Sequence, residues 1–290
     1  MRDTPTAPGA YVEVAGAPLY YEDAGDGPAL VLLHQGLADS RMYDDQFAAL
    51  AQHYHVVRYD LHGFGRSGTP TAPYTHHAAL HALLNHLGIA RTALVGMSLG
   101  GSIALDVALT YPERVGALLL LATGLAGYPV GEATAALAAP LGAAFAAGAF
   151  ARAIDLSVRL WVDGPRRGPE QVDPAVRERF RTLYTDVLRR TRERGRPADL
   201  LDPPASTRLD ALHVPTLIVV GSGDVPDVLD QAELLARGIA GACKVVLPHL
   251  AHLFNMERPQ EVNALLLTYL AQQYGADDMR QRHAGSSGSS

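Results

Sequence analysis

The chain has 290 residues, of which 48% are hydrophobic and 19% charged, and its formal net charge is −6. These values fit one large globular domain, or one domain with an insertion, and exclude a disordered chain. The acidic balance gives no ground for expecting nucleic acid or an anionic membrane as a partner. The single cysteine, Cys243, excludes an internal disulfide and fits a reducing compartment. The first residues lack the apolar core of a signal peptide, and no apolar run is long enough to span a bilayer, so a cytoplasmic location is expected.

Strand and helix patterns alternate along the first 121 residues. Short runs on either side of Gly16 predict an opening hairpin, and continuous apolar runs predict strands that are buried on both faces. The predicted hairpin strands are 11–14 and 18–21, the further strands 29–33, 55–60, 93–95 and 117–121, and the helices 42–53, 75–87 and 103–109. This alternation is typical of an α/β fold with a mostly parallel central sheet and helices on both faces.

The strand pattern stops from about residue 124 to residue 210, where only helical patterns occur. These cover 132–151, 153–161 and 174–194, and the sheet pattern then resumes with strands 215–220 and 243–247 and helices 228–237 and 259–272. We therefore expect a core in two parts, 1–123 and 211–274, a helical lid or cap at 124–210, and a flexible tail at 275–290. Cys243 lies in a predicted strand, where we expect a small buried residue rather than a reactive thiol.

The segment Gly96-Met97-Ser98-Leu99-Gly100 follows a strand pattern and precedes a helical one. In this context G-x-S-x-G predicts a nucleophile elbow, a turn so tight that its serine takes strained backbone angles. Gly96 and Gly100 leave room where a Cβ would press on the crossing strand or helix. The helix N-terminus favours negative charge that develops near Ser98. The alternative is a serine that only caps the helix.

A serine hydroxyl is a poor nucleophile, so it needs a base, and the base needs an acid that orients it. Both are expected in loops at the C-terminal edge of the parallel sheet. Asp224 follows one late strand pattern and His252 follows the other, which gives the chain order serine, aspartate, histidine. Asp227 and His249 lie three residues from them and are the competing candidates.

Together these residues resemble the alpha/beta-hydrolase superfamily of serine hydrolases. The resemblance covers about residues 11–273 and rests on the elbow, His34-Gln35-Gly36, residues 60–67 and 221–224, and His252. It implies the alpha/beta-hydrolase fold with a helical lid insertion. Segments 38–42 and 161–165 look most like small bacterial esterases and hydrolases similar to 3-oxoadipate enol-lactonase.

The resemblance also assigns roles to particular residues. It implies Ser98 as the nucleophile, His252 as the general base and Asp224 as its orienting acid. The oxyanion hole would consist of the backbone N–H groups of Gly36 and Leu99. Its loop normally reads His-Gly before the oxyanion residue and here reads His34-Gln35. Either the hole has a slightly different geometry, or the Gln35 side chain binds a polar group of the substrate.

Several further side chains are candidates for substrate binding or for a metal. An apolar pocket and ordinary core packing explain the candidate substrate-binding set equally well, namely Met42, Met97, Trp161 and Leu253. His77 and His81 have helical spacing, but no carboxylate lies between them in a metalloprotease arrangement, so no metal is expected.

The resemblance implies hydrolysis of a carboxylic ester or lactone of a small, largely apolar substrate through an acyl-enzyme on Ser98. No metal or organic cofactor is implied. The same triad serves hydrolases of C–C bonds, perhydrolases, and acyl-transferring or cyclising enzymes of secondary metabolism. A hydrolase fold that works as a small-molecule receptor is an alternative of another class. The expected partner is a small-molecule substrate, with no nucleic acid and no membrane, and the sequence leaves a homodimer open.

Overall fold

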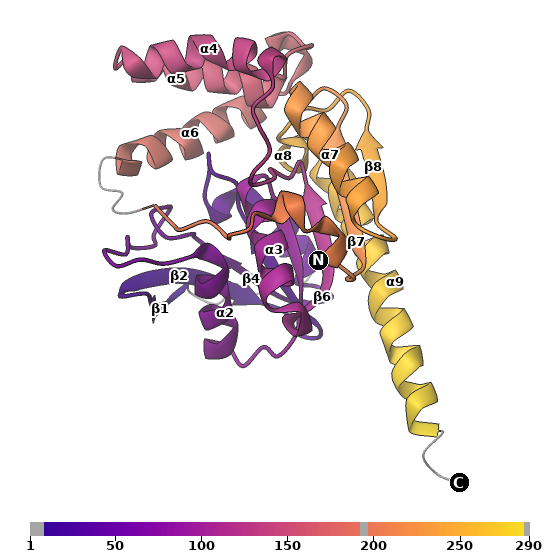
Figure 1. Cartoon of the computed structure of the whole chain (residues 1–290). Coiled ribbons are helices and arrows are strands. Elements are labelled where there is room, and N and C mark those ends of the chain that lie inside the picture. Colours follow the sequence, from indigo (N-terminus) through magenta and orange to yellow (C-terminus); the bar gives the residue numbers. More distant parts are fainter. Residues whose placement is uncertain (1–8, 192–196, 287–290) are drawn as a thin grey trace.

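The computed structural model describes residues 9–191 and 197–286, and in them eight strands form one sheet in the order β1-β2-β4-β3-β5-β6-β7-β8 (Figure 1). The strands from β4 across to β8 run parallel, whereas β2 pairs antiparallel with both β1 and β4. The predicted mostly parallel sheet is therefore confirmed. The strands are β1 (Ala10–Val14), β2 (Ala17–Ala24), β3 (Ala29–Leu33), β4 (His55–Tyr59), β5 (Thr92–Met97), β6 (Val115–Leu121), β7 (Thr216–Gly221) and β8 (Cys243–Leu247).

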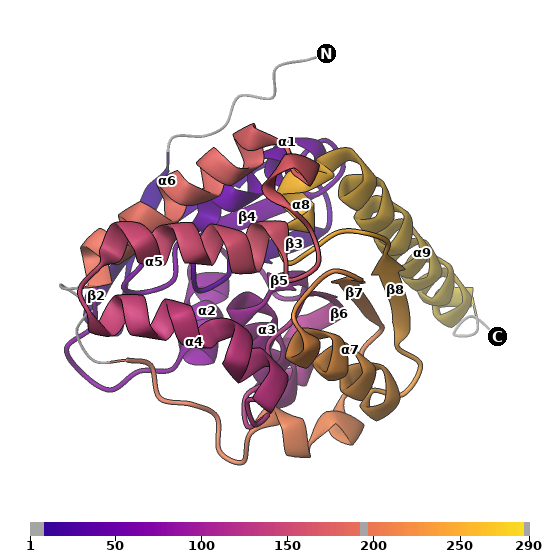
Figure 2. The same cartoon turned by 90° about the horizontal axis from the view of Figure 1, so that it is seen from above.

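Helices cover both faces of the sheet, as the sequence predicts. Figure 2 shows α1, α8 and α9 on one side of the strands and α2, α3 and α7 on the other. The helix predicted over 42–53 is a 3-10 turn, Ser40–Tyr43, followed by α1. These helices are α1 (Asp44–Leu50), α2 (His76–His86), α3 (Leu99–Thr110), α7 (Pro226–Gly238), α8 (Phe254–Glu257) and α9 (Pro259–Ser286).

The central strands of the sheet are buried in the core, whereas the outermost strand β8 is partly exposed. Every residue of β5 and β7 is buried, as expected for parallel strands covered on both faces. The prediction that Cys243 is buried is wrong, because its side chain is exposed. Cys243 begins β8, which has a neighbour on one side only, so the helices cover it incompletely.

Residues 124–210 form a helical insertion between β6 and β7. It consists of α4 (Glu132–Ala146), α5 (Phe150–Ser157), a π-helical turn (Val158–Asp163) and α6 (Pro174–Thr191), which Figure 1 shows stacked beyond one edge of the sheet. The single helix predicted over 132–151 is wrong, because it ends at Ala146. Gly148 has φ of 66°, and its N–H donates to Phe145 O at 3.0 Å, so the chain turns there and α5 begins.

The last helix is longer than the sequence predicts. It extends from Pro259 to Ser286 instead of ending near residue 272, and it includes most of the stretch expected to be a flexible tail. Five of residues 276–282 are strong helix formers (alanine, methionine, glutamine and two arginines), the other two are aspartates and none is proline, so the stretch supports a continued helix. Residues 287–290 lie outside the described part. No helix in the described part is long and apolar enough to cross a membrane.

Candidate active site

Ser98 forms the turn between β5 and α3. Its backbone has φ of 51° and ψ of −113°, a conformation that residues with a Cβ rarely adopt. A Cβ on Gly100 would lie 2.0 Å from Leu33 O, and one on Gly96 would lie 2.3 Å from Gly100 O. Only glycine therefore fits at these two positions, as the elbow pattern predicts. The Ser98 side chain makes no capping hydrogen bond to α3, which excludes the alternative of a serine that only caps the helix.

His252 and Asp224 meet through loops that follow β8 and β7. His252 Nδ1 lies 2.8 Å from Asp224 Oδ2, and the two residues are only 2% and 1% exposed. The other carboxylate oxygen of Asp224 accepts the Val225 N–H at 2.8 Å, so the carboxylate is held from both sides. Because a carboxylate accepts hydrogen bonds, Nδ1 carries the proton and Nε2 is left free to accept one.

The two competing candidates lie elsewhere. Asp227 Oδ2 accepts the N–H of Gly131 at 3.0 Å, so this carboxylate holds the start of α4 and not the imidazole. His249 is exposed, with φ of 61° in the loop after β8. The geometry therefore pairs Asp224 with His252.

Ser98 and His252 lie at the same edge of the sheet. Both follow the C-terminal ends of parallel strands, β5 for Ser98 and β8 for His252. Among the described residues no hydrogen bond joins the Ser98 hydroxyl to the imidazole. Such contacts are often long without substrate and shorten when it binds.

The loop after β3 lies beside the elbow. A Cβ on Gly36 would lie 3.5 Å from Leu99 Cδ2, so the two residues expected to form an oxyanion hole are neighbours. Leu99 is the first residue of α3, and its N–H therefore has no partner within the helix. The backbone of Gly36, from the loop after β3, and that of Leu99, from the start of α3, therefore lie close together beside Ser98.

His34 holds this loop in place. Its Nε2 accepts the Leu61 N–H at 2.9 Å, so its proton is on Nδ1, which donates to Gln35 O at 2.7 Å. Its ring also contacts Phe64 edge-on, with the ring centroids 5.2 Å apart. His34 is a structural residue that fixes the backbone at Gln35.

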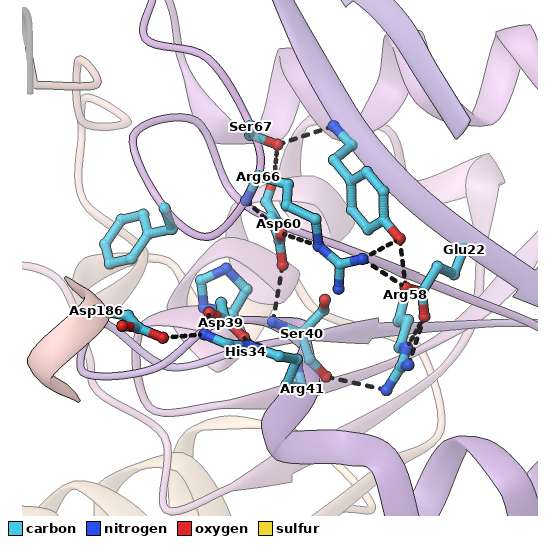
Figure 3. A network of polar contacts seen from close by, with 12 residues as sticks. Glu22, His34, Asp39, Ser40, Arg41, Arg58, Asp60, Arg66, Ser67 and Asp186 are labelled. Atoms are coloured by element: carbon cyan, nitrogen blue, oxygen red, sulfur yellow. Dashed lines mark hydrogen bonds and ion pairs between the residues drawn. The ribbon is translucent and has the colours of Figure 1, made fainter. Parts of the chain in front are cut away.

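A polar network extends from this loop to the helical insertion (Figure 3). Asp60 accepts the Ser40 N–H at 2.9 Å and the Arg66 N–H at 2.7 Å. Arg41 Nη2 contacts Asp39 at 2.6 Å and Asp186 of α6 at 2.9 Å. Burial by itself would raise the pKa of Asp39, but the hydrogen bonds and charge of Arg41 outweigh burial and hold it below its ordinary value. Sequence reasoning missed this link because Arg41 and Asp186 are far apart in the chain.

The helical insertion contacts the loops of both His252 and Asp224. The Trp161 ring, in the π-helical turn, lies 4.9 Å from the His252 ring between centroids, with the planes tilted by 54°. A Cβ on Gly164 would lie 2.5 Å from Gly223 O, next to Asp224. Arg167 forms a buried pair with Glu257, at 2.6 Å, that fixes the insertion to α8.

The predicted substrate-binding residues differ in burial and in whether they contact the catalytic candidates. Met42, Met97 and Leu253 are at most 1% exposed and belong to the main hydrophobic core. Trp161 is half-buried and contacts the imidazole, and Gln35 is buried with its amide unpaired. The structure thus brings Trp161 to the site directly.

No cluster suited to a metal ion occurs in the part of the chain that the structure describes. His81 stacks on Tyr111, with the ring centroids 4.1 Å apart, and His77 lies at 6.2 Å from the same ring. Both histidines pack against Tyr111, which follows the C-terminal end of α3, whereas Ser98 precedes its N-terminal end.

Comparison with known proteins agrees with this geometry. The family model described as alpha/beta hydrolase fold matches residues 28–259, which is most of the chain. The chain belongs to the alpha/beta hydrolase fold family. This alpha/beta hydrolase is 31% identical to a hydrolase from Pseudomonas aeruginosa PA01 of known structure, with 90% of this chain and 98% of that chain covered and a TM-score of 0.72.

Two further similar proteins are named as hydrolases with different substrates. The enol-lactonase from Burkholderia xenovorans LB400 is 26% identical, with a TM-score of 0.74, and the match covers 90% of this chain and all of the other (100%). A 2-hydroxy-6-oxo-6-(2'-aminophenyl)hexa-2,4-dienoic acid hydrolase from Metapseudomonas resinovorans is 27% identical over 272 residues, with 90% of each chain covered. The alpha/beta hydrolase is therefore an enzyme whose relatives are hydrolases, as the resemblance implies.

Proposed function

We propose that this alpha/beta hydrolase is a serine hydrolase that cleaves a carboxylic ester or lactone of a small, largely apolar substrate. The observation that carries the proposal is the buried Asp224–His252 hydrogen bond at the sheet edge where Ser98 is held in a strained turn. A buried carboxylate on Nδ1 leaves Nε2 as a base, which is what a serine nucleophile requires. The solved enol-lactonase, at 26% identity, supports a lactone or ester substrate.

The proposed reaction has two halves. Ser98 Oγ attacks the ester carbonyl carbon while its proton passes to His252 Nε2, and Asp224 stabilises the imidazolium. The oxyanion of the tetrahedral intermediate accepts hydrogen bonds from the N–H groups of Gly36 and Leu99. The C–O bond to the alcohol then breaks, and His252 returns the proton to the leaving oxygen. A water molecule repeats these steps on the acyl-enzyme and releases the acid.

The helical insertion acts as a lid in this proposal. Trp161 packs against the imidazole at a tilt of 54° and, in this proposal, limits access of water to it. Met42, Met97 and Leu253 are buried in the main hydrophobic core and are therefore not exposed to a substrate. The half-buried indole of Trp161 offers an apolar surface beside the imidazole, which favours a substrate with an apolar body.

Hydrolysis of a C–C bond is the second candidate reaction, because two relatives are named as hydrolases of 6-oxo dienoic acids. The Metapseudomonas resinovorans relative is 27% identical, and a 2-hydroxy-6-oxo-6-phenylhexa-2,4-dienoate hydrolase from Comamonas testosteroni is 25% identical. Such an acid has no ester bond, so its hydrolysis breaks a C–C bond beside the 6-oxo carbonyl. The same Ser98, His252 and oxyanion donors would serve that reaction.

The first test is the intact mass of the protein after incubation with a fluorophosphonate. We expect one adduct on the wild type and on Ser102→Ala, and none on Ser98→Ala. Ser102 is the matched control because it lies one turn further along α3. An adduct retained by Ser98→Ala refutes the assigned nucleophile, and no adduct on folded wild type favours a receptor.

A substrate panel then separates the two reactions. Simple esters and lactones should be turned over many times per enzyme molecule. Faster cleavage of a 2-hydroxy-6-oxo dienoate than of any ester would reverse the order of the two candidates.

A further inference from the structure

Gln35 carries a buried amide group that has no partner. The residue is 1% exposed, and neither its Oε1 nor its Nε2 is hydrogen-bonded within the described chain. A free amide offers two donors and an acceptor oxygen, and leaving them unpaired away from water is costly. Native proteins keep such groups rarely, and a binding role is one reason to keep them.

The loop cannot relieve this cost by moving. His34 Nδ1 donates to the Gln35 carbonyl at 2.7 Å, and His34 is itself fixed by the Leu61 N–H at 2.9 Å. Ala38 N–H also approaches the Gln35 carbonyl, at 3.5 Å. The backbone of Gln35 is therefore held next to Gly36, which adjoins Leu99, and the amide keeps its hydrogen-bonding capacity unused.

A second buried glutamine shows that the fold satisfies such groups elsewhere. Gln46 is 0% exposed, and its Nε2 donates to Asn255 O and to Asn263 Oδ1, both at 3.1 Å. Its Oε1 accepts from Asn255 Nδ2 at 3.2 Å. The two glutamines match in residue type and burial and differ in whether the amide has partners.

We infer that Gln35 is a specificity-determining residue that binds a hydroxyl group on the acyl part of the substrate, next to the scissile carbonyl. The inference rests on the proposed ester hydrolysis. A hydroxyl is the smallest single group that suits both unpaired atoms of the amide, because it donates and accepts, whereas a ketone or ether oxygen only accepts. Gln35 directly precedes Gly36, whose N–H is the proposed oxyanion donor, and we therefore assign the bound hydroxyl to the carbon next to the scissile carbonyl. The substrate class assigned is 2-hydroxy acid esters.

The test compares methyl mandelate, each enantiomer separately, with methyl phenylacetate, which lacks only the hydroxyl. The quantity measured is the ratio of kcat/KM for the two esters in the wild type, in Gln35→Met and in Gln46→Met. Because the intrinsic reactivity of each ester is the same with every variant, only a change in the ratio reports on the side chain. We expect Gln35→Met to lower the ratio for one enantiomer about tenfold, as for one lost hydrogen bond, and Gln46→Met to leave it unchanged.

Thermal unfolding adds a readout that does not require substrate. Gln35→Met removes an unpaired amide, so we expect a Tm about 2 to 4 °C above the wild type, whereas Gln46→Met breaks satisfied hydrogen bonds and lowers the Tm. If Gln35→Met does not fold, Gln35→Ala replaces it in the ratio measurement.

The outcomes separate this inference from the proposed function. An unchanged ratio in the Gln35 variants, with methyl phenylacetate still cleaved, overturns the role of Gln35 and leaves ester hydrolysis intact. A Gln35-dependent preference for 2-hydroxyethyl phenylacetate instead would place the hydroxyl on the alcohol part and also overturn it. A wild type that cleaves none of these esters refutes the proposed function itself.

Discussion

Replacing Ser98 with glycine is expected to give a protein that is inactive but more stable than the alanine variant. With φ of 51° and ψ of −113°, Ser98 is in a region where a residue with a Cβ is strained by about 1 to 3 kcal/mol. Glycine relieves that strain but makes the unfolded chain more flexible, at a cost of about 0.4 to 1 kcal/mol. For a strain near 2 kcal/mol, Ser98→Gly should exceed Ser98→Ala in free energy of unfolding by about 1 kcal/mol.

Comparison of these two variants isolates the backbone effect, because both lack the hydroxyl. Urea unfolding followed by circular dichroism gives the free energies, and a thermal scan should show a Tm about 2 to 4 °C higher for Ser98→Gly. Neither variant should react with a fluorophosphonate. Equal stability of the two, or a less stable glycine variant, would refute the argument that the turn at position 98 is strained.

Three further predictions concern other groups. Asp224→Asn should lower kcat on a cleaved ester by about 10⁴-fold with little change in KM, as steady-state kinetics can measure. The reason is that an asparagine amide no longer fixes the His252 tautomer with its proton on Nδ1. Arg167→Met should cost about 3 to 5 kcal/mol, because it leaves the Glu257 charge buried and unpaired. Adding Glu257→Leu should recover the part due to that charge but not the hydrogen bonds of Arg167 to Val162 O and Asp163 O, and equal Tm values for the two variants would contradict this. Burial raises the pKa of Asp106 from 3.8 to about 6 and outweighs the opposing charge of Arg208, so the folded protein binds this proton more tightly than the unfolded chain. The contribution of Asp106 to the free energy of unfolding should therefore fall by about 3 kcal/mol as pH rises from 4 to 6 and stay level above pH 6. Asp106→Asn should lack this loss, and urea unfolding of both proteins at pH 4 and pH 6 measures the difference.

The local parts of the site could be predicted from the sequence because they depend on short-range sterics. The spacing of Gly96 and Gly100 around Ser98 predicts a tight turn. A Cβ on either glycine would lie within 2.3 Å of a backbone oxygen, of Gly100 in α3 or of Leu33 in β3. The alternation of strands and helices gives the parallel sheet, and the sheet brings the ends of β5, β7 and β8 to one edge. Position along the chain therefore indicates the serine, the acid and the base.

What the sequence could not decide depends on contacts across the fold. Asp224 and Asp227 follow the end of β7 by three and six residues; this spacing favours Asp224, and the loop after β8 shows that Asp224 is the one that meets His252. Cys243 is in an apolar run, and its exposure follows from the place of β8 at the edge of the sheet. The ion pair of Arg41 with Asp186 joins residues from two regions whose relative position no local pattern records.

The contact between Trp161 and His252 gives the protein a built-in optical reporter. Trp161 is the chain's one tryptophan, so excitation at the red edge of the absorption band observes this position alone. A change of charge on the imidazole, 4.9 Å from the indole, alters the surroundings of the excited state and hence its emission. Arrival of a substrate and formation of an acyl-enzyme can each be followed in stopped-flow without any added dye.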